Sequence, residues 1–144
     1  MQFEGFDHID MRVPSLAKAQ RFYDKLMPAL GLSVQRFAHV DAAGDWKDVG
    51  ETTPCNVLEY YSAPAAGAAS FFLGVIEDAG MQPTSTRIAF RLSSLSRLEE
   101  MGASLPGMGA LSVERSADWE TYPAVFFEDP CGTKLELCCR KPAR

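Results

Sequence analysis

The sequence predicts an α+β fold made of two βαβββ units in tandem, with residues 1–80 in the first and residues 81–144 in the second. Three observations predict it. The start of the chain repeats near its middle, the expected strands alternate polar and apolar residues, and apolar residues recur at helical spacing after each first strand. Both units are expected to share one structural domain through an internal duplication.

The repeat is visible when "FDHIDMRVPSLAKAQ" is written above "STRIAFRLSSLSRLE" without gaps. Four identical pairs then align at one constant step: Ile9 with Ile88, Arg12 with Arg91, Ser15 with Ser94, and Leu16 with Leu95. The step slightly exceeds half the chain, as expected for a duplicated unit.

The first copy opens with an expected strand over residues 6–13. A helix follows, with Ser15 as its N-cap, and Pro28 and Gly31 end it. Three runs rich in β-branched and aromatic residues predict the remaining strands, over residues 32–40, 56–62 and 69–77. The polar stretch 41–54 is expected to be a loop.

The second copy repeats this order with a strand over residues 86–92 and a shorter helix over 94–103. The glycine-rich stretch 105–110, "LPGMGA", is interpreted as a connection. Three further strands are expected over residues 111–117, 123–129 and 133–139, and "DPCGT" has the composition of a tight turn between the last two.

Composition excludes several function classes. The net charge is −5 and the basic residues are scattered, which argues against a nucleic-acid partner. No apolar run is as long as a membrane span, and the first residues lack the pattern of a signal peptide. The four cysteines form no CxxC pair, so we expect reduced thiols and a cytoplasmic location. No motif of a nucleotide cofactor is found.

Strand period decides which residues share a face. If Ile9, Met11 and Val13 pack on the helix, then the other face of this strand carries only polar residues, His8, Asp10 and Arg12. An ordinary exposed strand and a strand lining a cleft both give this alternation. Two curved sheets paired edge to edge would form a cup with helices outside, and the polar face would then line the cup.

The same argument places residues from other strands on the cup face. In the second copy, Arg87 and Arg91 of the first strand and Glu136 of the last strand lie on the cup face. In the first copy, Glu59 in the strand over 56–62 lies on it. A buried carboxylate needs a partner, because an unpaired charge is strongly unfavourable in a medium of low dielectric constant. The cup face is therefore a candidate site. The long loop with Trp46 is the candidate lid over it.

At this point the pattern resembles a known family, the vicinal-oxygen-chelate superfamily. It includes glyoxalase I, extradiol dioxygenases, methylmalonyl-CoA epimerase, and the fosfomycin- and bleomycin-resistance proteins. Three segments carry the resemblance: "FDHIDMRVPSLAKAQRFYDKLMPALGL", "RIAFRLSSLSRLEEMGA" and "AVFFEDPCGTKLELC". It implies the glyoxalase-like cup and spans nearly the whole chain.

The resemblance also implies a metal-ligand set, from which this sequence departs. Metal-dependent members use a His on the first strand and a Glu on the last, and His8 and Glu136 match those positions. A further His usually opens the second half, where this sequence has Arg87, which only donates hydrogen bonds and cannot coordinate a metal. The resemblance implies a divalent ion (Zn, Ni, Mn or Fe), but weak or absent binding is favoured. An open catalytic site needs three protein ligands, and only His8 and Glu136 match.

Two functions follow as hypotheses. The first is a glyoxalase-like lyase or isomerase, or a dioxygenase-type enzyme, acting on a small oxygenated substrate, with Glu136 as base or ligand, His8 as acid or ligand, and Arg87 as an electrophilic clamp. A purely structural Glu136–Arg87 ion pair is an equal alternative. For His8, a role as a polar pocket group is favoured over that of a ligand.

The second hypothesis is a metal-independent protein that binds and sequesters a small drug or metabolite. In either case the expected substrate contacts are Asp10, Arg91, Glu59 and Trp46. A homodimer is expected because relatives commonly dimerise and two small halves leave apolar edges to cover.

Overall fold

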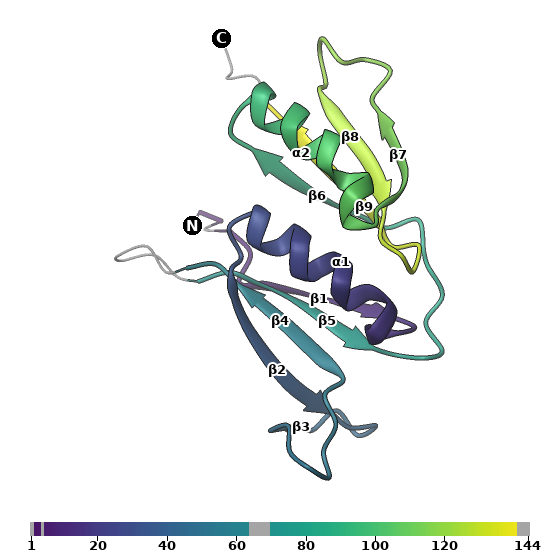
Figure 1. Ribbon diagram of the computed structural model, residues 1–144. Coiled ribbons are helices and arrows are strands. Elements are labelled where there is room, and N and C mark those ends of the chain that lie inside the picture. Colours follow the sequence, from purple (N-terminus) through teal and green to yellow (C-terminus); the bar gives the residue numbers. More distant parts are fainter. Residues whose placement is uncertain (1, 4, 64–69, 141–144) are drawn as a thin grey trace. The chain divides into compact units, whose positions relative to one another are not determined.

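The computed structural model describes residues 2–3, 5–63 and 70–140 of the chain (Figure 1). The chain divides into two compact units, Met1–Met81 and Gln82–Arg144. Each unit is a mixed sheet with one long helix across one face (Figure 1). The α+β fold class expected from the sequence is confirmed.

The first unit has a five-stranded sheet in the order β1-β5-β4-β2-β3. Its elements in chain order are β1 (His8–Val13), α1 (Leu16–Ala29), β2 (Val34–Val40), β3 (Trp46–Lys47), β4 (Val57–Tyr61) and β5 (Phe72–Glu77). Only β1 and β5 pair in parallel, and every other neighbouring pair is antiparallel.

The second unit has a four-stranded sheet in the order β6-β9-β8-β7. Its elements are β6 (Arg87–Leu92), α2 (Leu95–Met108), β7 (Leu111–Arg115), β8 (Ala124–Glu128) and β9 (Lys134–Cys139). The first and last strands, β6 and β9, are again the parallel pair. The two units therefore share one topology, apart from the short strand β3.

Both helices begin at the serines that the repeat aligns. The Ser15 hydroxyl accepts a hydrogen bond from the backbone N–H of Lys18, and the Ser94 hydroxyl accepts one from Arg97. Such caps satisfy a backbone donor that the first turn leaves free, and each stabilises a helix by about 1 kcal/mol. The N-cap predicted at Ser15 is confirmed, and Ser94, which the repeat aligns with it, caps the second helix in the same way.

Strand β1 separates polar and apolar residues as its alternation predicts, whereas β5 and β9 are buried along most of their length. In β1, Met11 and Val13 are buried, whereas His8, Asp10 and Arg12 are exposed. The buried side of the first sheet meets the apolar face of α1, whose buried residues are Leu16, Ala19, Phe22, Tyr23, Leu26 and Met27. In the second unit, α2 buries Leu98, Met101 and Leu105. Each unit therefore has its core between helix and sheet, and its polar face lies on the opposite side.

Two expectations about elements were wrong. The stretch 105–110 is not simply a connection, because α2 continues through Pro106 and ends at Met108. Leu105 is fully buried, and its packing outweighs the helix-breaking tendency of the proline that follows. Loop 41–54 also contains a short strand, β3, which pairs with the end of β2. Residue 69, at the start of the third strand expected in the first copy, lies outside the described residues.

Two further findings concern the cysteines and the helices. All four cysteines are free thiols. No helix in the described part of the chain combines the length and the apolar character needed to cross a membrane.

Candidate functional site

The polar face of the first sheet has a row of four residues at its centre, one from each of four neighbouring strands. The strand register places Asp10 of β1 beside Gly74 of β5, Gly74 beside Glu59 of β4, and Glu59 beside Arg36 of β2. The predicted orientation of Glu59 toward the same face as Asp10 follows from this register. Two carboxylates thus flank a glycine, with a guanidinium at the end of the row.

Gly74 leaves room for the Asp10 side chain, which lies over it. A Cβ added to Gly74 would collide with the Asp10 carboxylate, although the glycine backbone itself has no positive φ. Gly74 is buried beneath this contact. The space between the two carboxylates therefore depends on the absence of a side chain at position 74.

Beside this row runs a stack of rings. The His8 imidazole stacks on the Phe72 ring with centroids 4.6 Å apart and planes 7° from parallel. Phe72 also stacks on Tyr61 at 4.6 Å, and the Arg36 guanidinium lies over the Tyr61 ring, 4.9 Å from its centroid. The Tyr61 hydroxyl donates to Glu59 at 2.9 Å. This stack, from His8 to Arg36, gives the face a continuous aromatic surface.

Asp7 holds the His8 ring in place. Its carboxylate lies 2.7 Å from His8 Nδ1, and Asp10 Oδ2 lies 3.9 Å from Nε2. The hydrogen bond to Asp7 raises the pKa of His8 above its ordinary value of 6.5, with a smaller contribution from the charge of Asp10. Sequence reasoning did not identify Asp7, although its position next to His8 in "FDHID" was a usable signal.

The loop that carries Trp46 is fixed at its base by Asp41. One Asp41 oxygen accepts the backbone N–H groups of Ala43 and Asp45, and the other lies 2.7 Å from Lys47 Nζ. The hydrogen bond from Lys47 is the largest cause that lowers the pKa of Asp41 to about 2. Asn56 adds two hydrogen bonds to the backbone of Val40, both at 2.8 Å. The base of the loop is therefore rigidly connected to the sheet.

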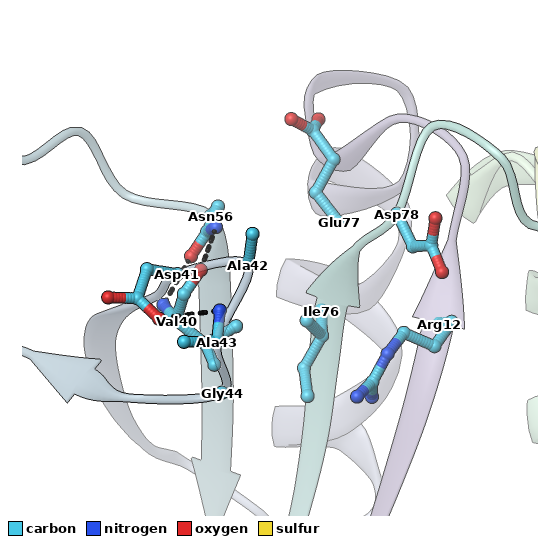
Figure 2. A pocket seen from close by; sticks show the side chains of 10 residues that line it. All are labelled: Arg12, Val40, Asp41, Ala42, Ala43, Gly44, Asn56, Ile76, Glu77 and Asp78. Atoms are coloured by element: carbon cyan, nitrogen blue, oxygen red, sulfur yellow. Dashed lines mark hydrogen bonds between the residues drawn. The ribbon is translucent and has the colours of Figure 1, made fainter.

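Two pockets flank this loop. The first, of about 600 Å³, lies between the Asp41–Gly44 turn on one side and Arg12, Ile76 and Asp78 on the other (Figure 2). The second, of about 550 Å³, is lined by Arg36, Glu59, Trp46 and neighbouring residues of β2 and the loop. The second pocket brings together two of the predicted substrate contacts, Glu59 and Trp46.

The polar face of the second sheet centres on Glu136. This carboxylate is 5% exposed, and its Oε1 accepts a hydrogen bond of 2.5 Å from the Tyr122 hydroxyl, which raises the pKa of Tyr122. The Arg140 guanidinium lies over the Tyr122 ring at 4.6 Å. Tyr122 comes from the turn before β8, and sequence reasoning missed it because nothing in the local sequence indicates this contact.

Arg87 contacts a ring on this face. Its guanidinium lies 4.6 Å from the centroid of Phe126, the residue that pairs with Glu136 across β8 and β9. Among the described residues, Arg87 and Glu136 form no ion pair. Arg91 follows on the same face of β6, opposite Cys138. Burial, as the largest cause, raises the pKa of the Cys138 thiol, so it is a poor nucleophile.

The two parallel strand pairs place corresponding residues at their centres. Asp10 pairs with Gly74 in the first unit, and Ala89 pairs with Glu136 in the second. Gly74 therefore occupies the position of Glu136, and each central pair combines one carboxylate with one small residue. His8 and Glu136 belong to different units, and their predicted convergence stays a prediction.

The donor groups of these two faces do not fit a metal ion within either unit. No group of three or more His, Cys, Asp or Glu residues in the described parts of the chain could hold one. Arg87 has no lone pair to offer and Gly74 has no side chain, so neither residue can be a ligand.

Comparison with known proteins gives matches to solved structures. No protein-family model matches the chain, and no curated protein matches it by sequence. The fosfomycin resistance protein FosX from Listeria monocytogenes is 17% identical, with 98% of this chain and 97% of that chain covered and a TM-score of 0.62. A putative glyoxalase from Bacillus halodurans is 20% identical, with 94% and 96% covered and a TM-score of 0.61.

A glyoxalase/bleomycin resistance protein from Albidiferax ferrireducens gives a similar result, with 17% identity, 94% and 98% coverage, and a TM-score of 0.59. The chain has the vicinal-oxygen-chelate fold. The resemblance inferred from the sequence is confirmed at the level of this fold. A mutant of the Listeria FosX was crystallised with Mn(II) and 1S,2S-dihydroxypropylphosphonic acid, so that protein with the vicinal-oxygen-chelate fold binds a metal and a small ligand.

The contact with Asp7 predicts how His8 titrates. We expect a His8 pKa above 6.5, and a lower value in Asp7→Asn, because the largest cause of the shift is then removed. A raised pKa in the folded state stabilises the protein below the unfolded-state pKa, and this contribution is lost as the pH rises through the folded-state value.

NMR titration of the two histidines, assigned with a His39→Gln variant, measures this pKa. Asp78→Asn is the matched control and should leave the His8 pKa unchanged. A His8 pKa at or below 6.5 in the unmodified chain contradicts the assignment.

Proposed function

We propose that the protein binds a small molecule on the polar face of its first sheet without a metal ion. The ligand class that this face suits has a planar or aromatic part together with a positively charged or hydrogen-bond-donating group. The observation that carries the proposal is the pair of carboxylates, Asp10 and Glu59, on either side of Gly74 and next to the aromatic stack.

The side chains on this face support this ligand class. The stack from His8 through Phe72 to Tyr61 offers ring faces on which a planar group can lie. The two carboxylates accept hydrogen bonds and attract a cation, and Gly74 leaves the floor between them free of a side chain. Small-molecule sites commonly combine an apolar surface with a few fixed polar groups. Trp46 is proposed as a further ligand contact, because it lines the pocket that Arg36 and Glu59 share.

The donor set supports metal independence. The position where the resemblance implies a second His holds Arg87, and its guanidinium lies on the Phe126 ring. A cation at this position would repel a metal nearby. Within the second unit, Arg87 and Arg91 are instead proposed to bind a carboxylate or another anionic group.

A thermal-shift screen of metabolites and drugs in the presence of EDTA tests the proposal. A ligand that raises the melting temperature is then titrated by calorimetry. For a cationic ligand, we expect Asp10→Asn and Glu59→Gln each to weaken binding by about tenfold, which is about 1.4 kcal/mol. Glu100→Gln on α2 is the control and should leave the affinity unchanged. Binding that EDTA abolishes and Mn(II) or Zn(II) restores contradicts the proposal, as does unchanged affinity in both variants.

A second candidate function is catalysis with Glu136 as general base. The observation that favours it is the burial of Glu136 and its hydrogen bond from Tyr122, which fixes one oxygen of the carboxylate. The second oxygen accepts no hydrogen bond within the described part of the chain, so it can take a proton from a bound substrate. On this view, Arg87 is the electrophilic clamp.

If the protein is an enzyme, Glu136→Gln removes the base and keeps the shape of the side chain. We expect turnover to fall about 100-fold or more, since general bases contribute 10²–10⁴-fold. Mass spectrometry of each screened ligand after incubation measures turnover, and Glu114→Gln is the control. A ligand that is converted at the same rate by Glu136→Gln removes the catalytic candidate and leaves the binding proposal standing.

A further inference from the structure

A groove of about 250 Å³ lies in the second unit, between α2 and the strands β7 and β8. It is on the helix side of the sheet, so it is separate from the polar face that carries Glu136. Leu98 of α2 and Val125 of β8 line it and are buried, and Val113 of β7 is half-buried beside them. The groove is therefore an apolar site that neither of the two polar faces uses.

The internal repeat shows why the second unit is open here. The helices α1 and α2 have the same length and begin at aligned residues, so Gly102 occupies the position of Tyr23. Tyr23 is fully buried, and the centroid of its ring lies 6.5 Å from that of Tyr60. Gly102 has no side chain, and a Cβ added to it would lie only 3.1 Å from Val125 Cγ2. A large buried ring of the first unit therefore has no counterpart at the aligned position of the second.

The next helix position differs in the same direction. Ala103 aligns with Asp24, which connects α1 to the sheet in the first unit. The Asp24 carboxylate accepts hydrogen bonds from the Tyr60 hydroxyl at 2.8 Å and from the Gln35 side-chain amide at 2.7 Å. The methyl group of Ala103 can form neither bond. Helix α1 is therefore joined to β4 and β2 along this side, whereas α2 leaves a groove at the aligned position.

A distortion of β7 accompanies the groove. The register of β7 with β8 shifts between Leu111 and Glu114, and Ser112 has a positive φ of 50°. Such a bulge redirects side chains, and Val113 lies within it. A residue other than glycine is strained in this backbone conformation, and strain of this kind is common beside ligand sites. The bulge therefore contributes to the shape of the groove.

The rim of the groove is polar. Arg115 lines the groove, and its Nη2 donates a hydrogen bond of 3.3 Å to Glu99 Oε1. The same guanidinium lies 3.9 Å from the centroid of the Trp119 ring. A guanidinium attracts the face of an aromatic ring, and a carboxylate accepts a hydrogen bond from a hydroxyl group. The side chains of Arg115 and Glu99 are 60% and 50% exposed, so a ligand can reach both of them. The rim therefore favours an aromatic ring with a hydrogen-bond donor over a purely aliphatic molecule.

We propose that this groove binds a small phenol, that is, a molecule with one aromatic ring and one hydroxyl group. The ring lies on the apolar lining beside the Arg115 guanidinium, and the hydroxyl donates to Glu99. A cavity of about 150 Å³ is enough to bind benzene, so this groove of about 250 Å³ has room for a substituted ring. The first unit supports this ligand class, because a tyrosine, itself a phenol, is buried at the aligned position. The site is independent of the ligand proposed for the first sheet.

An NMR titration of the chain with p-cresol, the tyrosine side chain as a free molecule, tests the proposal. We expect the backbone amide signals of Gly102, Ala103 and Val113 to shift together, with a dissociation constant of about 1 mM or lower. The comparison ligand is 4-methylcyclohexanol, which has a similar size and a hydroxyl group but no π system. It should bind about threefold more weakly, because it loses the interaction with the Arg115 guanidinium.

Three variants locate the site. Ala103→Leu extends a side chain into the groove and should weaken p-cresol binding about tenfold or more. Ala17→Leu adds the same side chain at an exposed alanine of α1, and as the matched control it should leave the affinity unchanged. Arg115→Gln should lose the preference for p-cresol over 4-methylcyclohexanol. The dispersion of the NMR spectrum shows that each variant is folded.

Four results would overturn the proposal. They are shifts confined to the first unit, no shift at about 10 mM p-cresol, equal affinities for the two ligands, and an unchanged p-cresol affinity in folded Ala103→Leu. Asp10→Asn and Glu59→Gln, which test the ligand face of the first unit, should not change the shifts at Gly102. Failure of the phenol site and failure of the proposed function are therefore distinguishable.

Discussion

The parallel pairing of the first and last strands in each unit is the constraint on which the rest of the structure depends. It places β5 between β1 and β4, and β9 between β6 and β8. His8 opens the first ladder opposite Phe72, and Arg87 opens the second opposite Lys134, at positions that the internal repeat aligns. Because side chains alternate along a strand, this register decides which residues face the helix and which share the polar face.

The same register explains how the polar residues are distributed. Two carboxylates directly opposite each other on neighbouring strands would repel, and each central pair avoids this by combining one acid with one small residue. In the first unit the acid is on the first strand, as Asp10, and in the second it is on the last, as Glu136. Each unit thus keeps one carboxylate at the centre of its parallel strand pair.

The sequence predicts what depends on local order. The alternation in "HIDMRV" and the Ser15 cap are properties of neighbouring residues, and the repeat is read from the sequence directly. Contacts between strands were harder to predict. The aromatic stack needs the register of three strands, and the Tyr122–Glu136 hydrogen bond joins a turn to a strand. The predicted end of α2 was wrong because the burial of Leu105 outweighs the helix-breaking effect of Pro106.

The contact between Asp10 and Gly74 allows the most direct test of this account, through a double-mutant cycle measured by urea unfolding. Alanine at position 74 should lower the stability of the unmodified chain by about 1 kcal/mol, because its Cβ collides with the Asp10 carboxylate. In an Asp10→Ala background the same change should be neutral or stabilising by about 0.5 kcal/mol, since alanine suits an extended backbone better than glycine. An equal effect of Gly74→Ala in both backgrounds would contradict the contact between the Asp10 carboxylate and Gly74.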